Sequence, residues 1–236
     1  MRRDNPWPDC AYGTTAPFFL ALDGGGRGGR EIIIEALRAN DVKVMIEVGC
    51  FLCGSTLQWL RACDELTVIG VDTWDGDWAS YLEWSASDPA QSVNVRHLAP
   101  EELARIVAEM RRSGTFCTAM NNVRAYRDRF VPIRRRSPDA LRYLSQKGIV
   151  PELVYIDAGK ERLDLEVAHE LFPQAILCGD DWLWPDASGV LRMQNHVKAF
   201  AEEHDCEIRS ERQSWLLIPR SSKGDPVALA SAGIGG

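Results

Sequence analysis

The sequence predicts an α/β fold in which helices cover both faces of a mostly parallel β-sheet. Short runs rich in Val, Ile and Leu alternate with segments of helical periodicity, which is the pattern of βαβ units. Several of these runs end on an acidic residue, and the first leads through a turn of small residues into a helix. Polar residues at the carboxyl ends of parallel strands indicate a ligand site at that edge of the sheet.

The chain is long enough for one domain with a full core, since it has 236 residues of which 45% are apolar. We expect a flexible N-terminal segment at 1–29 with a glycine-rich hinge at 23–29, a folded domain at 30–220 and a disordered tail at 221–236. The predicted strands are 43–47, 66–72, 130–133, 153–157, 174–181, 206–209 and 214–218. The predicted helices are 30–38, one from Leu57 onward, 100–110, 116–126, one from Pro138 onward, 162–171 and 191–200.

The charge of the chain argues against two classes of partner. A net charge of −7 and a pI near 5.2 give no broad basic surface for nucleic acid or anionic membrane. The chain opens with no basic and apolar leader, and no apolar segment approaches the ~20 residues that span a bilayer. We therefore expect a cytoplasmic protein that acts on a small molecule.

Seven cysteines are scattered through predicted strands and helices (10, 50, 53, 63, 117, 178 and 206). Their odd number and scatter favour reduced, buried thiols over a disulfide framework. Cys50 and Cys53 also form a Cys-x-x-Cys pair. A redox or zinc role is the alternative to packing, but no second pair is present to complete a zinc site.

The segment 43–57 carries the first functional signal. It lacks the Gly-x-Gly-x-x-Gly spacing of a dinucleotide site, because Gly49 is followed by Cys50, Phe51 and Leu52. Glu47, at the end of the strand, suits a ligand with a positive amino group and no phosphate at that point. S-adenosylmethionine (SAM) is such a ligand.

These residues resemble the first motif of class I SAM-dependent methyltransferases, in the branch whose loop reads Glu-x-Gly-x-x-x-Gly-Gly-Ser. Ile46–Glu47–Val48–Gly49 and Gly54–Ser55–Thr56 carry the resemblance. It implies a Rossmann-like, seven-stranded sheet closed by a C-terminal antiparallel hairpin, and Glu47, Gly49, Cys50, Gly54 and Ser55 as cofactor-binding residues. Cys53 departs from the pattern by replacing a glycine, and we expect its β-carbon to impose an ordinary backbone conformation.

Asp72 ends the second strand 25 residues after Glu47, where a carboxylate grips the ribose hydroxyls of a nucleoside. Thr73 and Trp74 follow it in an aromatic and acidic turn that resembles the adenosine-side turn of the same branch. For Trp74 and Trp78, loop packing is the alternative to contact with cofactor or substrate. The resemblance implies that Ser137, by its position, borders the adenine. We expect Ser137 to cap a helix that starts at Pro138.

Two further segments leave alternatives open. Residues 81–97 are polar and aperiodic, which makes them a candidate lid over the site. The triplet 134–136 consists of three arginines and fits either an anion site or a solvated strand end.

Asp157, Asp180 and Asp181 end the fourth and fifth strands and should converge beside the cofactor loop. Three carboxylates brought together repel one another unless they are neutralised, and a hard divalent cation such as Mg²⁺ is the simplest neutralising group. Ile156–Asp157–Ala158 with Gly179–Asp180–Asp181 resembles the metal signature of macrocin-type antibiotic and sugar O-methyltransferases. This resemblance covers about residues 40–205 and implies that the metal chelates two substrate hydroxyls, with Asp157 also near the cofactor.

The base that removes the acceptor proton is harder to identify. Where related enzymes often carry a histidine or acid after Ile-Asp-x, this chain has Gly159–Lys160–Glu161. Lys160 would act as the base, orient an anionic substrate, or lie in solvent. His196, near the start of the helix 191–200, is the other candidate.

Together these signals predict a SAM-dependent, Mg²⁺-assisted O-methyltransferase acting on a hydroxylated natural product or sugar. Two alternatives stay open: a SAM- or nucleotide-binding enzyme that uses the same acids for a different reaction, and a degenerate fold kept as a binding protein. A homo-oligomer joined through the Trp- and Pro-rich N-terminal segment is also compatible with the sequence.

Overall fold

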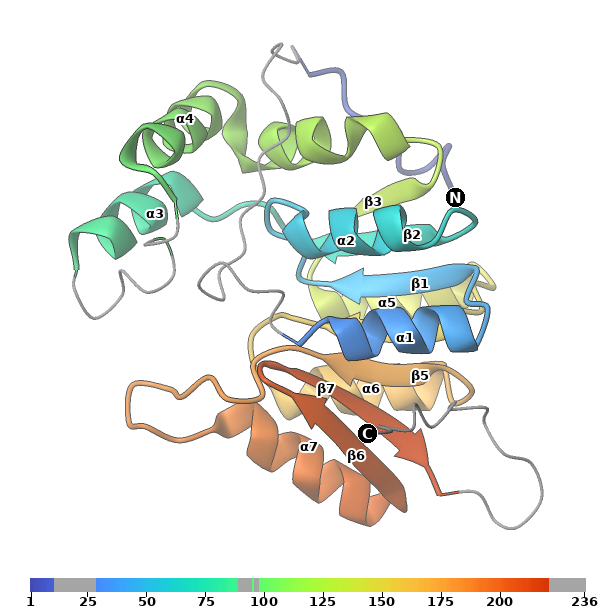
Figure 1. Cartoon of the computed structure of the whole chain (residues 1–236). Coiled ribbons are helices and arrows are strands. Elements are labelled where there is room, and N and C mark those ends of the chain that lie inside the picture. Colours follow the sequence, from blue (N-terminus) through green and yellow to red (C-terminus); the bar gives the residue numbers. More distant parts are fainter. Residues whose placement is uncertain (11–28, 89–94, 96–97, 221–236) are drawn as a thin grey trace, which may run out of the picture.

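A computed structural model of the chain describes residues 1–10, 29–88, 95 and 98–220 (Figure 1). Most of the predicted hinge, the part of the predicted lid beyond Asp88 except Val95, and the predicted tail lie outside the described residues. The helices are α1 (Glu31–Ala39), α2 (Gly54–Ala62), α3 (Trp78–Ser87), α4 (Pro100–Val123), η2 (Arg124–Tyr126), α5 (Ser137–Gln146), α6 (Arg162–Leu171) and α7 (Arg192–Glu203).

One seven-stranded sheet runs through the molecule in the order β3-β2-β1-β4-β5-β7-β6. Its first five strands are mutually parallel, and β7 is antiparallel to both β5 and β6. The predicted α/β fold with its C-terminal hairpin is therefore confirmed. The strands are β1 (Val44–Val48), β2 (Thr67–Asp72), β3 (Phe130–Arg134), β4 (Leu153–Ile156), β5 (Ile176–Gly179), β6 (Cys206–Glu211) and β7 (Ser214–Pro219).

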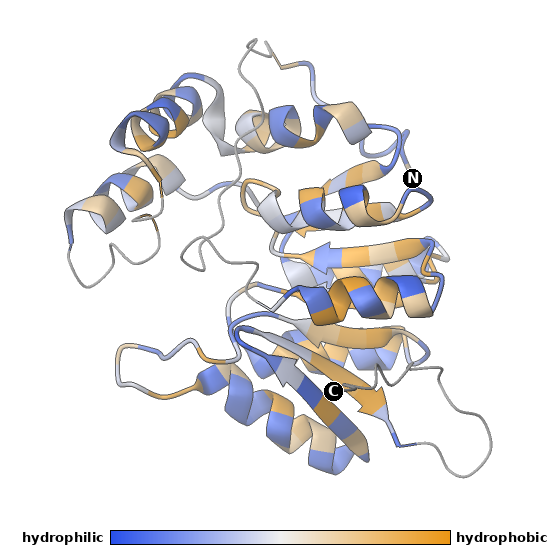
Figure 2. Cartoon of the chain, in the orientation of Figure 1, coloured by the Kyte–Doolittle hydropathy of each residue, from blue (hydrophilic) through white to orange (hydrophobic). Residues whose placement is uncertain are grey.

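The two faces of the sheet bury separate apolar clusters. Met45 and Tyr155 face the side covered by α1, α2 and α4, whereas Ile46 and Val154 face the side covered by α5, α6 and α7. Alternation along each strand sends successive side chains to opposite faces, so strands covered on both faces become apolar throughout. Figure 2 shows this pattern in the parallel strands, which are largely hydrophobic, whereas β6 and the helices carry both kinds of residue.

The strand register brings the acidic strand ends to one edge. Val48 pairs with Val71 and with Ile156, and Ile156 pairs with Gly179. The residues that come directly after the four paired positions are therefore neighbours at the carboxyl edge of the sheet: Gly49, Asp72, Asp157 and Asp180.

Two local predictions are wrong, and a third agrees with the structure. The start of the segment predicted to be aperiodic is helical, since α3 extends to Ser87 and packs against α4. The helices predicted at 100–110 and 116–126 correspond to the two parts of α4, which are separated by a kink at Gly114, and η2 continues the second part. The φ of 78° at Gly114 is one that only glycine adopts readily. Ser137 does not cap α5: it lies inside the helix, and Arg136 occupies the cap position without a side-chain hydrogen bond.

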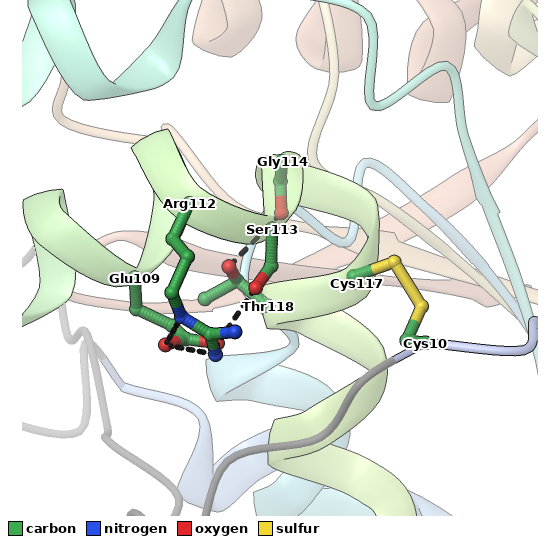
Figure 3. The surroundings of a disulfide bond; sticks show 7 residues. All are labelled: Cys10, Glu109, Arg112, Ser113, Gly114, Cys117 and Thr118. Atoms are coloured by element: carbon green, nitrogen blue, oxygen red, sulfur yellow. Dashed lines mark hydrogen bonds and ion pairs between the residues drawn. A yellow bond between two sulfur atoms is a disulfide. The ribbon is translucent and has the colours of Figure 1, made fainter.

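A disulfide joins Cys10 to Cys117, 107 residues later, so the prediction that all seven cysteines are reduced is wrong for this pair (Figure 3). Their Cα atoms lie 5.8 Å apart, within the range that a disulfide spans. The bond ties the N-terminal segment to α4 just beyond its kink. The pairing could not be predicted because it depends on how the first ten residues lie on the fold.

Those first ten residues pack along β3 and α5. The Trp7 ring meets Phe130 edge-on at 6.3 Å, and the Asn5 amide donates to the Tyr143 hydroxyl at 3.1 Å. Lys147 pairs with Asp4 at 2.8 Å.

Within the described part of the chain, no helix is long and apolar enough to span a bilayer.

Candidate functional site

A cavity of about 800 Å³ opens at the carboxyl edge of the sheet. Small-molecule sites in proteins commonly enclose roughly 300–1,000 Å³, so the volume of this cavity is that of a small-molecule site. Its walls come from the loop after β1, the ends of β2, β4 and β5, and the first turns of α2, α3 and α5. Of the predicted site residues, those that line it are Gly49, Cys50, Gly54, Ser55, Asp72, Thr73, Ser137, Asp157, Lys160, Asp180 and Asp181.

The loop between β1 and α2 has a backbone that few residues can adopt. Gly49 has φ +87°, and a β-carbon there would lie 1.9 Å from the carbonyl oxygen of Asp157. Cys53 also lies in the left-handed region, at φ 60° and ψ 33°, so the expectation of an ordinary conformation there is wrong. The side chain of Cys53 is fully buried and packs in the core beside α2. This packing accommodates a thiol at the position where the resembled motif has glycine.

Glu47 does not line the cavity. Its side chain is fully buried beneath α2, where its oxygens accept hydrogen bonds from the Ser55 hydroxyl, the Thr56 hydroxyl and the Trp59 indole at 2.5, 2.5 and 3.1 Å. Burial raises the pKa of Glu47, and the three donors oppose that rise. The residue fixes the first turn of α2 against the strand, and Gly54 and Ser55 of that turn line the cavity.

Asp72 reaches across to the same loop. Its Oδ2 accepts from the backbone N–H groups of Cys50 and Phe51 at 3.0 and 2.8 Å, and its Oδ1 accepts from Trp74 N–H at 2.8 Å. A carboxylate has about four acceptor positions, so one remains for a ligand hydroxyl. Asp72 therefore shapes the loop and still faces the cavity.

The two tryptophans after β2 divide between packing and the cavity. Trp74 is buried, and its indole donates to the Phe51 carbonyl at 2.6 Å while its ring packs on Phe116. It does not line the cavity. Trp78 does, against Phe51 at 5.0 Å and Tyr81 at 5.5 Å between ring centroids.

Ser137 and its neighbours form the wall at the β3 end. The Ser137 hydroxyl donates to Asp164 at 2.5 Å, and burial raises the pKa of Asp164. Of the arginine triplet, Arg135 and Arg136 border the cavity, and all three side chains are exposed.

At the β4–β5 end the three predicted metal ligands come together, but a cation from the chain lies among them. Arg30, the residue before α1, places its Nη2 2.5 Å from Asp180 Oδ2 and 4.0 Å from Asp157 Oδ2. Its side chain is 8% exposed. Across the residues that the structure covers, no group of three or more His, Cys, Asp or Glu side chains is arranged to hold a metal ion. As they lie, the aspartates do not fit Mg²⁺, because Arg30 engages an oxygen that the metal would need.

Electrostatics at this end reflect burial and crowding. Burial, then repulsion from Asp180 and Asp181, raises the pKa of Asp157 well above its ordinary value. Burial raises the pKa of Asp181 to about 6, although Lys160 opposes the rise. Burial works against the charge of Arg30, yet the neighbouring Tyr155, Asp180 and Asp157 raise its pKa overall.

The two residues predicted as candidate bases lie in different places. Lys160 lines the cavity, with its Nζ 3.5 Å from Asp181 Oδ1 and 4.9 Å from the centre of the Trp184 ring. Both are contacts that a positively charged ammonium makes. His196 lies on α7, half-buried, and is not among the residues around the cavity.

Arg30 was not predicted as a site residue, because nothing in the sequence around a lone arginine before a short helix indicates which residues it will contact. Its carboxylate partners, Asp157 and Asp180, lie more than half the chain away in sequence. Gln213, in the β6–β7 turn, also borders the cavity and was missed for the same reason. The one indication in the sequence was the predicted convergence of three aspartates, because three neighbouring negative charges need a cation to neutralise them.

No protein-family profile matches the chain, and no curated protein matches it either. Among solved structures, a candidate caffeoyl-CoA O-methyltransferase from Staphylococcus aureus is similar over 82% of this chain and 84% of its own, with a TM-score of 0.56 and 13% identity. The SAH-bound methyltransferase PaMTH1 from Podospora anserina is similar over 80% and 77%, with a TM-score of 0.51 and 11% identity. At such low identity these likenesses concern the fold, and the chain has the fold that these methyltransferases share.

Proposed function

We propose that the protein is a SAM-dependent O-methyltransferase that acts on a hydroxylated small molecule such as a natural product or a sugar. The observation that carries the proposal is the cavity where the glycine loop, Asp72 and the acidic ends of β4 and β5 meet. Asp72 and Ser137 line this cavity, and so do the aromatic side chains of Trp78 and Trp184. The SAH that one structural neighbour binds is the expected product of such a reaction.

The polar residues that line the cavity offer a partner for each part of SAM. The free acceptor position of Asp72 would take a ribose hydroxyl, and Ser137 would border the adenine. The amides at the start of α2, beside Gly54 and Ser55, would face the methionine carboxylate, because a helix N-terminus attracts anions. Asp157 would face the ammonium group. When bound, SAM supplies a methyl group on a positively charged sulfur.

The acceptor would lie at the β4–β5 end. Trp184, whose ring centre lies 4.9 Å from Lys160 Nζ, offers a flat apolar surface at this end that suits an aromatic ring or the apolar face of a sugar. The transfer forms a bond from the acceptor oxygen to the methyl carbon and breaks the carbon–sulfur bond, whose electron pair stays on sulfur. Lys160 would orient the acceptor, and a carboxylate beside it would take up the hydroxyl proton.

Mg²⁺ assistance remains a prediction of the sequence, with Asp157, Asp180 and Asp181 as the ligands. Because these residues do not fit the ion as they lie, we derive no step through a metal.

Calorimetry with SAH tests the cofactor half of the proposal. We expect binding by the wild type and at least about tenfold weaker binding by Asp72→Ala, since the loop and the ribose both lose a partner. Asp75→Ala, an exposed acid in the same turn, should bind as the wild type does. Absence of SAH binding by the wild type, or equal affinity in the Asp72 variant, would refute the proposal.

The reaction itself is tested by incubating the protein with methyl-labelled SAM and a panel of catechols, phenols and sugars. Label in an extractable product together with stoichiometric SAH is the expected result. Conversion of an acceptor without formation of SAH would favour the alternative in which the reaction is not methyl transfer.

A further inference from the structure

We propose that Arg30 is the resident cation at the acceptor end of the cavity, where it takes the position that the sequence alone assigns to a divalent metal ion. The inference rests on the proposed function, because it concerns how that site carries its charge. It assigns to the first residue of the folded domain a place beside the acceptor, and it predicts an enzyme whose site needs no added metal.

The geometry of the contact supports this assignment. Arg30 Nη2 lies at hydrogen-bond distance, 2.5 Å, from Asp180 Oδ2, and the same nitrogen is 4.0 Å from Asp157 Oδ2. A Mg²⁺ ion needs these oxygens at roughly 2.0–2.1 Å in an octahedral arrangement. Guanidinium and metal cannot both bind Asp180 Oδ2 in this way, and their charges would repel each other.

The position of Arg30 is built into the fold. Gly29 has φ +82°, and a β-carbon there would lie 1.8 Å from the carbonyl oxygen of Glu211 in β6. Directly after Arg30, the first turn of α1 buries Ile32 and Ile33 in the core. The backbone on both sides is therefore fixed, and the guanidinium is not a surface group that reaches the aspartates by chance.

Charge balance is consistent with the same role. Arg30 faces Asp157 and Asp180, and Lys160 faces Asp181, so two cations from the chain stand against three carboxylates. Oδ1 of Asp180 is buried and has no hydrogen-bond partner among the described residues. An acceptor hydroxyl that donates to this oxygen would lie beside the guanidinium. There the fixed positive charge would stabilise the negative charge that develops on the acceptor oxygen.

Binding of Mn²⁺ tests the inference without knowledge of the acceptor. The free-ion signal of Mn²⁺ in electron paramagnetic resonance measures binding to the purified chain in the presence of SAH. We expect no specific binding by the wild type, and unchanged SAH affinity after treatment with EDTA. Arg30→Met should gain a Mn²⁺ site at least about tenfold tighter than any wild-type binding, and Arg30→Met/Asp180→Asn should lose it. Arg38→Met, on the exposed side of the same helix, should behave as the wild type does.

Stoichiometric Mn²⁺ binding by the wild type that Asp180→Asn abolishes would overturn the inference, and so would an Arg30→Met variant that folds but gains no site. If Arg30→Met does not fold, the wild-type titration alone decides. Failure here differs from failure of the proposed function: a protein that binds SAH and also binds Mn²⁺ through Asp180 refutes only the role of Arg30.

Discussion

At the scale of single residues, the site depends on a buried polar group that does not line the cavity itself. Glu47 is the clearest case, because it occupies the position of a cofactor contact in the sequence but accepts three hydrogen bonds within the protein. Its carboxylate holds the turn whose residues Gly54 and Ser55 line the cavity. A residue in such a position affects cofactor affinity and stability together.

Glu47→Gln should therefore destabilise the protein by about 1–3 kcal/mol, since the amide has one acceptor oxygen and would leave a buried donor unpaired. Urea unfolding measures the loss, and SAH affinity should fall in parallel. Glu202→Gln, exposed on α7, is the control and should stay within about 0.5 kcal/mol of the wild type. Equal stability of the two variants would contradict the account of Glu47.

Thiol reactivity offers a second test at this scale. Cys50, Cys53 and Cys178 are buried, and burial raises the pKa of each well above its ordinary value. In the native protein, Ellman's reagent should react with Cys63 and Cys206 alone, both of which are half-buried. The other three free thiols should appear only after denaturation. Fast native reaction at Cys50 or Cys53 would revive the redox interpretation of the Cys-x-x-Cys pair.

At the scale of elements, a pair of histidines lies where α6 meets the end of α7: His169 is in α6, and His204 directly follows α7. The ring of His169 lies 4.4 Å from that of His204 and 5.4 Å from that of Phe200. Burial, and then the neighbouring His204, lowers the pKa of His169. The folded state therefore favours the neutral imidazole.

The unfolded chain binds a proton at His169 more readily than the folded protein does, so stability should fall as the pH drops below about 6.5. Unfolding free energies measured from pH 7.5 to 5 should show this decline. His169→Phe keeps an aromatic ring against Phe200 and should reduce the slope. An unchanged slope in the His169 variant would place the pH dependence elsewhere.

At the scale of the whole molecule, the disulfide joins parts of the chain that lie far apart in sequence. A bond that closes a loop of this length restricts the unfolded chain and typically stabilises by about 2–4 kcal/mol. Cys117→Ser should lose stability in that range, and dithiothreitol should lower the wild type to the same level without affecting the variant. Cys206→Ser, which removes a free thiol, is the control. A wild type indifferent to reductant would refute a stabilising role for the bond.

Features set by local pattern and strand topology could be predicted from the sequence. Apolar runs ending on acids predicted the sheet and the edge at which Asp72, Asp157 and Asp180 meet, because strand direction alone fixes that edge. The way in which the carboxylates are neutralised could not be predicted, since Arg30 arrives from a distant part of the chain. Nor could the backbone of Cys53, where core packing overrides the preference of a β-carbon.

The contact between Gly29 and Glu211 has a consequence for synthesis on the ribosome. The hairpin that supports the residue before Arg30 is the last part of the sheet to be made, so a nascent chain ending after β5 already carries the aspartates but lacks this support. The wall of the cavity at Arg30 can take its final form only once β6 and β7 have emerged. A truncation at residue 205 would keep the sequence of all five parallel strands and still lack the hairpin that supports Gly29.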